Sequence, residues 1–348
     1  MPSIYDLSLP ELTHFVASHN QPPYRAKQIW QAVYGDLADS ADSLTTIPRL
    51  LRERLGAEFS FTRLTPIAEA KSSDHQTRKL LFQLPDGKRI EAVLMGYAKR
   101  RTTCISTQAG CAMGCVFCAT GQMGFLRHLS AGEIVEQVLW FARELKQHDD
   151  HLTNIVVMGM GEPFHNYDAT LAAMERLNDP DGFNFGARRM TISTVGLVPM
   201  IERFAKEKRQ INLAVSLHAA TDDLRTELLP INKKYPLAML FAAVREYYET
   251  TRRRVTFEWA LIQGKNDTAD QAHALARLAH DLPCHVNIIP LNPTRDYAGQ
   301  ATTRERAAAF KAVLEQHHIS CTIRVRRGID INAGCGQLAV TTGKHAPA

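Results

Sequence analysis

The sequence lacks the features that would place it in a membrane or outside the cell. None of its 348 residues belongs to an apolar run that approaches the roughly 20 residues of a transmembrane helix. The first ten residues do not show the charged and then apolar layout of a signal peptide. Internal repeats and low-complexity segments are also missing. We therefore expect a globular, cytoplasmic protein with no membrane partner.

A strong excess of charge of either sign is absent too. The chain has 41 Lys and Arg against 36 Asp and Glu, which leaves a formal net charge of +5 and an isoelectric point of about 8.8. Such a mildly basic protein permits an RNA partner but does not demand one. Apolar residues make up 45% and charged residues 22%, so the length accommodates one large domain and a small appendage.

Cysteine is scarce and unevenly spread. There are seven cysteines, an odd number, and three of them lie between positions 111 and 118. A disulfide scaffold usually distributes an even set of cysteines through a small secreted domain. Clustered thiols in a reducing compartment indicate a metal site instead.

Residues 1–60 are expected to form a small helical accessory domain. Two apolar runs at helical spacing are separated by a Pro-Pro pair, namely Leu9, Leu12 and Phe15, then Ile29, Val33 and Leu37. The segment also contains side chains that RNA-binding proteins use, Tyr24, Arg25, Lys27 and Trp30. Any small helical domain would contain such residues as well, so RNA contact stays open at this stage.

Residues 61–98 are expected to form a strand region with a hairpin. Two β-prone runs, 79–84 and 89–95, flank the turn signal Pro85-Asp86-Gly87.

From residue 99 to about 340 the pattern predicts alternating strands and helices. Strands are expected at 104–107, 155–158, 190–193, 211–217, 255–261, 286–290 and 321–325. Helices are expected at about 130–146, 168–177, 199–207, 237–250, 268–281 and 302–317. Repeated strand–helix units predict an α/β fold with a parallel sheet and right-handed crossovers. Six or so units fit an incomplete (β/α)6 barrel, and a doubly wound open sheet is the alternative.

Cys111, Cys115 and Cys118 form a C-x3-C-x2-C motif on a glycine-containing loop. Three thiolates at this spacing can bind a [4Fe–4S] cluster and leave its fourth iron open to chelate a small molecule. The aromatic Phe117 inside the motif can shield such a cluster from water. Zinc is the alternative, but it takes four ligands and usually uses a second Cys or His pair. His128 is a candidate fourth ligand, and no second pair stands nearby.

The cysteine motif, with an aromatic residue before its last cysteine, resembles that of the radical S-adenosylmethionine (SAM) superfamily. In that superfamily the open iron binds the amino and carboxylate groups of SAM, and one electron cleaves SAM to methionine and a 5′-deoxyadenosyl radical. Seven segments extend the match in order along residues 110–338, GCAMGCVFCATGQMGF, NIVVMGMGEP, RRMTISTVGLVP, VSLHA, LLPINKKYP, VNIIPLNP and GIDINAGCGQL. Together with PPYRAKQIW near the N-terminus, they resemble the RlmN/Cfr family of ribosomal RNA adenine methyltransferases.

The resemblance implies a SAM pocket. Its counterparts here are Gly161, Glu162, Ser193, Ser216, Leu217, His218 and Asn292. Among them, Gly161 and Glu162 are expected to hold the methionine end of SAM. Independently of the resemblance, these residues stand at or just after the expected carboxyl ends of strands, which form the functional face of α/β barrels.

The resemblance also implies a reaction that uses two SAM molecules per turnover. Carbon 2 of adenine is too electron-poor to attack SAM, so the first SAM methylates Cys335, and the second yields the radical that activates this S-methyl group. After the methylene radical has added to the adenine, Glu91 takes the ring proton. Cys104 then closes a transient disulfide with Cys335 and releases the methylated RNA. Strand alternation alone would make Glu91 a solvated residue, and Cys284 and Cys321 are expected in the core.

The family implies 23S rRNA as substrate, transfer RNA as a second candidate, and a reducing electron donor such as flavodoxin. Pro163 fits the branch that methylates C2, whereas the branch that methylates C8 of the same adenine tends to have Ala there. Asn332 and Gly334 depart slightly from the family's usual run around the methyl-carrying cysteine.

Two other functions stay open. One is an RNA-binding module with a structural metal, and the other is a radical SAM enzyme that acts on a protein or small molecule.

Overall fold

The computed structural model describes residues 1–292, 294 and 296–324, so Cys335, Asn332 and Gly334 lie outside the described residues. Its N-terminal part is helical, as predicted. The elements are η1 (Ile4–Asp6), α1 (Leu9–Ser18), α2 (Tyr24–Trp30), η2 (Gln31–Gly35) and α3 (Arg49–Glu58). Helix α1 begins with a capping box, in which Ser8 Oγ accepts from the Glu11 N–H at 3.3 Å and the Glu11 carboxylate accepts from the Ser8 N–H at 2.7 Å. No helix in the described part combines the length and hydropathy that a membrane crossing requires.

A ten-stranded mixed sheet forms the framework, in the order β1-β2-β3-β4-β7-β8-β9-β10-β11-β12. The strands are β1 (Thr65–Lys71), β2 (Thr77–Gln83), β3 (Arg89–Tyr97), β4 (Arg100–Cys104), β7 (Asn154–Val157), β8 (Met190–Thr194), β9 (Asn212–Ser216), β10 (Val255–Leu261), β11 (Cys284–Pro290) and β12 (Ser320–Ile323). From β4 onwards all neighbours are parallel and follow one another in chain order. A doubly wound sheet would reverse its strand order, so the incomplete barrel is confirmed.

The predicted hairpin is present, and its strands continue the barrel's own sheet. Strands β2 and β3 pair antiparallel with Gln83 opposite Arg89, and β3 pairs antiparallel with β4. The first barrel strand was expected at 104–107 but ends at Cys104. The next residues leave the ladder because the N–H of Ser106 donates to Gln137 Oε1 (2.8 Å) and that of Thr107 donates to the carbonyl of Met160 (2.9 Å). This turn leads into β5 (Gln108–Gly110), which pairs with β6 (Phe125–His128) in a separate small sheet.

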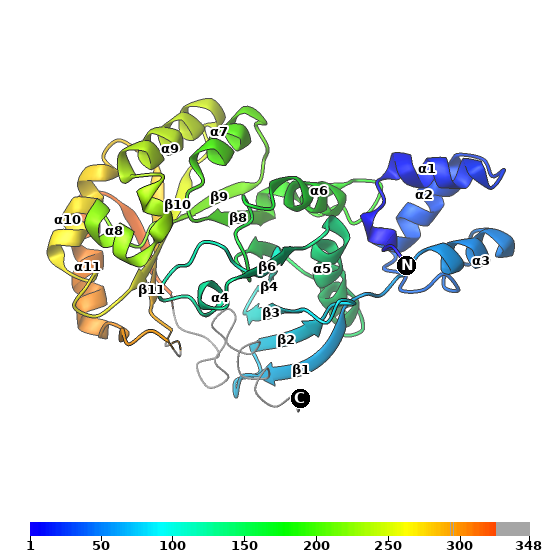
Figure 1. Ribbon diagram of the computed structural model, residues 1–348, viewed down its shortest axis with the longest axis horizontal. Coiled ribbons are helices and arrows are strands. Elements are labelled where there is room, and N and C mark those ends of the chain that lie inside the picture. The colour runs from blue at the N-terminus through cyan, green and yellow to red at the C-terminus, as the bar shows by residue number, and fades with distance from the viewer. Residues whose placement is uncertain (293, 295, 325–348) are drawn as a thin grey trace.

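The barrel helices agree with the predicted ranges to within a few residues. They are α5 (Ala131–Lys146), α6 (Tyr167–Asn178), α7 (Val198–Lys206), α9 (Leu237–Thr251), α10 (Ala269–Leu278) and α11 (Arg304–Gln316). Two short helices, α4 (Ala119–Gln122) and α8 (Asp222–Leu228), were not predicted because helical periodicity needs a longer window. In Figure 1 the long helices lie along the outer side of the curved sheet, and α1–α3 are grouped at the end of the molecule away from α8–α11.

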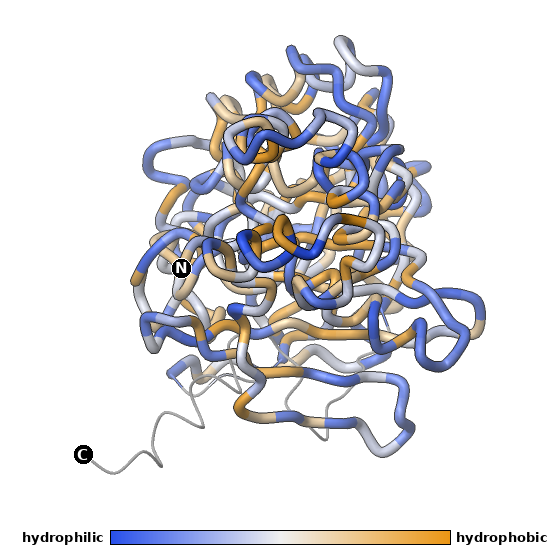
Figure 2. Tube along the Cα trace, turned by 90° about the vertical axis from the view of Figure 1, so that its right-hand side faces the viewer, coloured by the Kyte–Doolittle hydropathy of each residue, from blue (hydrophilic) through white to orange (hydrophobic). Residues whose placement is uncertain are grey.

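One large apolar core joins the helical N-terminal part to the barrel. It contains fully buried side chains from both, for example Tyr5, Leu55, Phe141 and Phe257. Hydrophobic segments accordingly gather in the middle of the molecule in Figure 2, and hydrophilic ones dominate its outer loops. Burial of each such large side chain stabilises the fold by about 1.5–3 kcal/mol relative to exposure.

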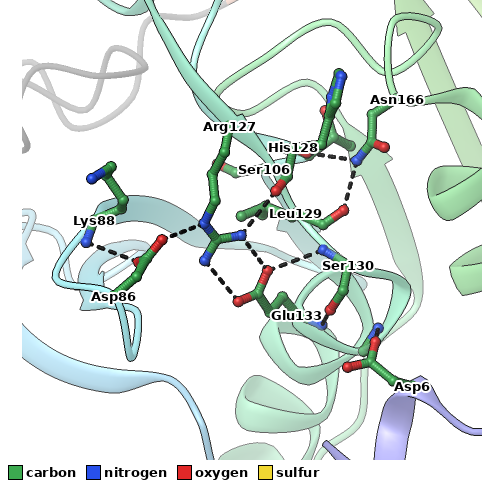
Figure 3. A network of polar contacts seen from close by, with 12 residues as sticks. Asp6, Asp86, Lys88, Ser106, Arg127, His128, Leu129, Ser130, Glu133 and Asn166 are labelled. Atoms are coloured by element: carbon green, nitrogen blue, oxygen red, sulfur yellow. Dashed lines mark hydrogen bonds and ion pairs between the residues drawn. The ribbon is translucent and has the colours of Figure 1, made fainter. Parts of the chain in front are cut away.

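A polar network fixes the hairpin turn and the N-terminal segment to helix α5 (Figure 3). The Arg127 guanidinium bonds to the Asp86 carboxylate at 2.5 Å and to both oxygens of Glu133 at 2.7 and 2.9 Å. The bond from Arg127 holds the pKa of Asp86 below its usual value. Asp6 accepts from the Gly132 N–H at 2.7 Å, at the first turn of α5. Strand β6, which carries Arg127, is thereby held beside the cysteine loop that precedes it.

Candidate active site

A cavity of about 390 Å³ opens at the carboxyl ends of the parallel strands, and its size is within the usual range for small-molecule sites. It receives nearly all the predicted site residues of the described chain, Glu91, Cys104, Cys111, Cys115, Cys118, Gly161, Glu162, Ser193, Ser216, His218 and Asn292. Leu217 is the exception: its side chain is fully buried behind the rim, and its N–H donates to the carbonyl of Glu258.

The cysteine loop lies at one side of this cavity. Backbone bonds hold it in place: the Cys111 N–H donates to Gly124 O (2.9 Å), and the Cys118 N–H donates to Cys115 O (3.1 Å). Burial raises the pKa of the Cys111 thiol to about 12 and that of Cys115 well above its usual value. Phe117 lines the cavity with its ring centroid 5.0 Å from that of His218, so an aromatic face covers the thiols.

The donor set of this loop fits a [4Fe–4S] cluster better than a single zinc ion. Three thiols from one loop share one cavity with apolar cover, and a bound metal would reverse the effect of burial by keeping them as thiolates. Zinc needs four ligands that converge on one point. Among the described residues, no three Cys, His, Asp or Glu side chains are arranged to hold one metal ion. His128 lies outside the cavity, and its Nδ1 is 3.1 Å from Gln108 Nε2.

Glu162 is anchored at the cavity wall. Its Oε1 accepts from the Phe164 N–H at 3.0 Å and its Oε2 from the Val195 N–H at 2.8 Å. Burial raises its pKa to about 7, against these hydrogen bonds, which lower it. The Thr194 side chain also bonds to this carboxylate. Of about four lone-pair sites on the two oxygens, one is therefore left to accept from an ammonium group.

Gly161 lines the same wall and has a backbone φ of +103°, which favours glycine. A Cβ there would lie 2.6 Å from Gln108 Cβ, and one on Gly159 would lie 2.6 Å from Ile105 O. The glycines therefore allow the β7 loop to approach the segment after β4.

Polar residues at the ends of β8, β9 and β11 complete the rim. Ser193 Oγ and Ser216 Oγ are 3.4 Å apart across neighbouring strands. His218 has a φ of +60°, and its Nδ1 accepts from the Ala260 N–H at 2.9 Å, which leaves the ring proton of the neutral imidazole on Nε2. Burial lowers the pKa of His218 to about 3, so the ring is neutral. Asn292 follows β11 and lines the cavity.

Glu91 and Cys104, from β3 and β4, also line the cavity. The expectation that Glu91 would be solvated by strand alternation is wrong, since it is only 2% exposed and its Oε2 lies 2.9 Å from the Nζ of the fully buried Lys79. Cys104 is half-buried, and the surrounding protein raises the pKa of its thiol to about 11 by desolvation, against a backbone hydrogen bond from Met158.

Sequence reasoning missed two further ionisable residues on the cavity wall. Glu258, in β10 between Ser216 of β9 and Asn287 of β11, is 4% exposed; Asn287 Nδ2 donates to its Oε1 at 2.9 Å. Its Oε2 has no hydrogen-bond partner among the described residues, and burial raises its pKa. A carboxylate inside the apolar run Val255–Leu261 was a readable signal. Arg324, just after β12, also lines the cavity.

Comparison with known proteins is consistent with this geometry. Residues 105–278 match the Radical SAM superfamily, and residues 3–60 match the Ribosomal RNA large subunit methyltransferase N-terminal domain. The chain is 51% identical to a probable dual-specificity RNA methyltransferase RlmN of Chloroflexus aurantiacus, over 99% of this chain and 93% of the relative. It is 49% identical to dual-specificity RNA methyltransferase RlmN 1 of Myxococcus xanthus, over 99% and 96%. The crystal structure of a radical SAM methyltransferase from Sphaerobacter thermophilus superimposes with a TM-score of 0.94 at 50% identity and covers 97% of this chain and 99% of that one.

These matches extend over nearly the full length of both partners and include the segment that carries the three-cysteine motif. Superfamily membership implies a [4Fe–4S] cluster and SAM as cofactors. The chain therefore belongs to the RlmN family of RNA methyltransferases within the radical SAM superfamily.

Proposed function

We propose that this enzyme methylates carbon 2 of an adenine in 23S rRNA, and of an adenine in transfer RNA, through an S-methylcysteine and a covalent protein–RNA adduct. One observation carries the proposal: a single cavity is lined by the three-cysteine loop, by the SAM-type rim, and by Glu91 and Cys104. The names of the relatives, dual-specificity RNA methyltransferases, support an RNA substrate of two kinds.

Cys111, Cys115 and Cys118 would hold the cluster, and Glu162 would accept from the ammonium group of SAM. The other rim contacts to SAM would come from Gly161, Ser193, Ser216, His218 and Asn292, and the predicted contact of Leu217 is not part of this proposal because its side chain lies behind the rim. When bound, the cluster supplies the electron that cleaves one of the two SAM molecules used per turnover. Val195 and Phe164 orient Glu162, because their N–H groups occupy one lone pair of each carboxylate oxygen. Phe117 and its apolar neighbours exclude water from this side.

Glu91 would accept the proton that leaves carbon 2 of the adenine. The Lys79 ammonium, whose Nζ lies 2.9 Å from Oε2 of Glu91, holds the carboxyl group in place at the cavity wall. The proton goes to a carboxylate oxygen of Glu91, and Lys79 then faces a neutral acid.

Cys104 would resolve the adduct by attack on the sulfur of Cys335, which lies outside the described residues. A disulfide forms between the two sulfurs, and the bond from Cys335 sulfur to the methylene carbon breaks with its electrons on carbon, which takes a proton to become the methyl group. Reduction of the disulfide by a cellular thiol restores both cysteines. Burial keeps Cys104 as a thiol, so it stays unreactive until the adduct changes its surroundings.

The proposed division of labour assigns RNA contact to residues 1–60, a strand extension to 61–98, and the radical chemistry to 99–340. A low-potential donor of the flavodoxin class would deliver the electron in the cytoplasm. Exposed Tyr24 and the neighbouring Arg25, whose guanidinium lies 4.9 Å from the tyrosine ring centroid, offer a stacking and cationic surface for RNA.

The test is nucleoside mass spectrometry after anaerobic reaction of the reconstituted protein with SAM, a reductant, and either 23S rRNA or transfer RNA. We expect 2-methyladenosine in both RNAs. Only 8-methyladenosine would move the enzyme to the other branch, and unmodified RNA together with SAM cleavage would indicate a different substrate. Cys335→Ala should give no product, and Cys284→Ala, which changes a buried thiol away from the cavity, is the matched control with normal product.

A further inference from the structure

Arg225 on helix α8 is a fully buried cation that bonds only to neutral oxygens. Its side chain is 0% exposed. The three guanidinium nitrogens donate to Leu217 O (3.3 Å), Asn232 Oδ1 (2.8 Å) and Val195 O (2.6 Å). No carboxylate among the described residues forms an ion pair with it. Burial lowers its pKa to about 10, so it remains charged at neutral pH.

A buried charge of this kind needs a compensating charge. Removing an ion from water costs several kcal/mol unless an opposite charge stands close by. The carboxylate of Asp222 exerts some attraction, but both it and Arg225 bond to the side chain of Asn232, which stands between them. His218, another titratable group near Arg225, is neutral. The side chains around Arg225 thus carry too little negative charge to balance its guanidinium.

The cysteine loop packs directly against the helix that carries Arg225. The Val116 N–H donates to Leu228 O at 3.1 Å, at the end of α8. Cys115 packs on the small apolar cluster formed by Val195, Ala219, Leu228, Leu229, Ile262 and Leu291. Val195, whose carbonyl accepts from Arg225 Nη2 at 2.6 Å, belongs to that same cluster. As protonated thiols the three cysteines carry no charge, whereas thiolates bound to a cluster do.

We propose that Arg225 is a fixed countercharge to the metal cluster: its guanidinium compensates the negative charge of the thiolate-bound cluster, strengthens retention of the metal and favours the reduced state. This role rests on the proposed function, because it needs the cluster to be held by this loop. Arg225 would act on the cluster electrostatically, through its positive charge, and not through a bond to a cysteine.

A purely structural role must be separated from this one, because Arg225 also ties together the ends of β8 and β9. Arg225→Gln removes the charge but keeps hydrogen-bonding groups, and Arg225→Lys keeps the charge but loses the planar fork. Arg143→Gln is the matched control. Arg143 also donates to neutral oxygens, those of Leu37 (2.9 Å) and Tyr5 (2.6 Å), but it lies on α5 against the N-terminal segment.

The experiment compares apo and iron–sulfur-reconstituted protein for the wild type and these three variants. Three quantities are measured anaerobically: the melting temperature, the rate of iron loss to a chelator, and the cluster midpoint potential by titration followed with electron paramagnetic resonance. Since hydrogen-bond losses affect apo and loaded protein alike, the difference between them isolates the coupling of Arg225 to the cluster.

We expect Arg225→Gln to gain less stability on reconstitution than the wild type, to lose iron about tenfold faster, and to have a more negative midpoint potential. Arg225→Lys and Arg143→Gln should resemble the wild type. Equal gain, iron loss and potential in Arg225→Gln and wild type would overturn the countercharge role and leave the proposed function intact. A wild type that binds no iron–sulfur cluster would overturn both.

If Arg225→Gln does not fold, Arg225→Lys still provides the test through pH. A buried ammonium loses its proton at lower pH than a guanidinium. Iron loss from Arg225→Lys should therefore accelerate as pH rises from 7 to 9, relative to the wild type over the same range. Parallel pH profiles of the two proteins would overturn the countercharge role.

Discussion

The Nζ of Lys79 lies 2.9 Å from Oε2 of Glu91, and the two side chains are 0% and 2% exposed. They come from the neighbouring strands β2 and β3, and only the glutamate reaches the cavity. A buried ion pair contributes little net stability compared with apolar residues, but loss of one partner leaves an uncompensated charge.

Replacement of Lys79 by Met should destabilise the protein by about 3–5 kcal/mol, because Glu91 then faces the cavity without its countercharge. It should also lower RNA methylation, because the Lys79 ammonium no longer holds the Glu91 carboxyl group in place. Denaturant unfolding and product formation measure the two effects.

The double variant Lys79→Met with Glu91→Gln is the control for this pair. Its loss of stability should be clearly smaller than the sum of the single losses, because no lone charge is left buried. Lys79→Arg, which keeps the positive charge, should retain more methylation than Lys79→Met. Additive losses of stability and unchanged methylation in Lys79→Met would show that the ion pair does not act on Glu91.

SAM affinity should rise with pH through about 7, the value to which burial raises the pKa of Glu162. The sign follows from the charge state: the carboxylate, present above this pKa, accepts from the SAM ammonium, whereas the neutral acid that prevails below it does not. Between pH 8 and pH 6 the affinity should fall by about tenfold. Anaerobic calorimetry of reconstituted protein measures it.

Glu162→Gln is the matched comparison for that titration. It should weaken SAM binding by about 1–2 kcal/mol at pH 8 by replacing a charge-assisted contact with a neutral one, and it should bind with little dependence on pH. Equal affinities of wild type and variant at pH 8 would remove Glu162 from the SAM pocket.

Alanine at Cys111, Cys115 or Cys118 should abolish SAM cleavage, because two thiolates hold a four-iron cluster poorly. Iron content and 5′-deoxyadenosine production are the measurements. Cys321→Ala, in β12 outside the cavity, should leave both unchanged. Wild-type iron and 5′-deoxyadenosine in all three variants would refute the assignment of the loop.

Replacement of Cys104 and replacement of Cys335 should have opposite effects, because Cys104 acts after the adduct has formed and Cys335 acts before. Cys104→Ala protein purified from cells should carry covalently bound RNA, visible as raised absorbance near 260 nm and as a shifted gel band that nuclease collapses. Cys335→Ala and the double variant should carry none. Adduct in Cys335→Ala would reverse the two assignments, and a fully active, RNA-free Cys104→Ala protein would exclude the two-thiol mechanism.

The sequence by itself determined the order of elements, the hairpin at Pro85–Gly87, the helices of the barrel, and the cysteine loop, because periodicity, turn residues and short-range spacing are local properties. It also located the rim residues, since the carboxyl ends of parallel strands meet at one face. The short helix Asp222–Leu228 and the true end of the first barrel strand at Cys104 were missed. The helix is too short for its periodicity to be read, and a bond from Ser106 to the side chain of the distant Gln137 draws the chain out of the strand.

Only the tertiary structure decided the electrostatics of the site. Strand alternation in the sequence predicts that Glu91 is solvated. In the folded protein it is buried beside Lys79. In the sequence Arg225 looks like an ordinary helix residue. Only the packing of α8 against the cysteine loop shows that it is buried there. The reason is physical: burial and the distance between charges depend on which strands and helices become neighbours, and a linear pattern of residue types does not contain those distances.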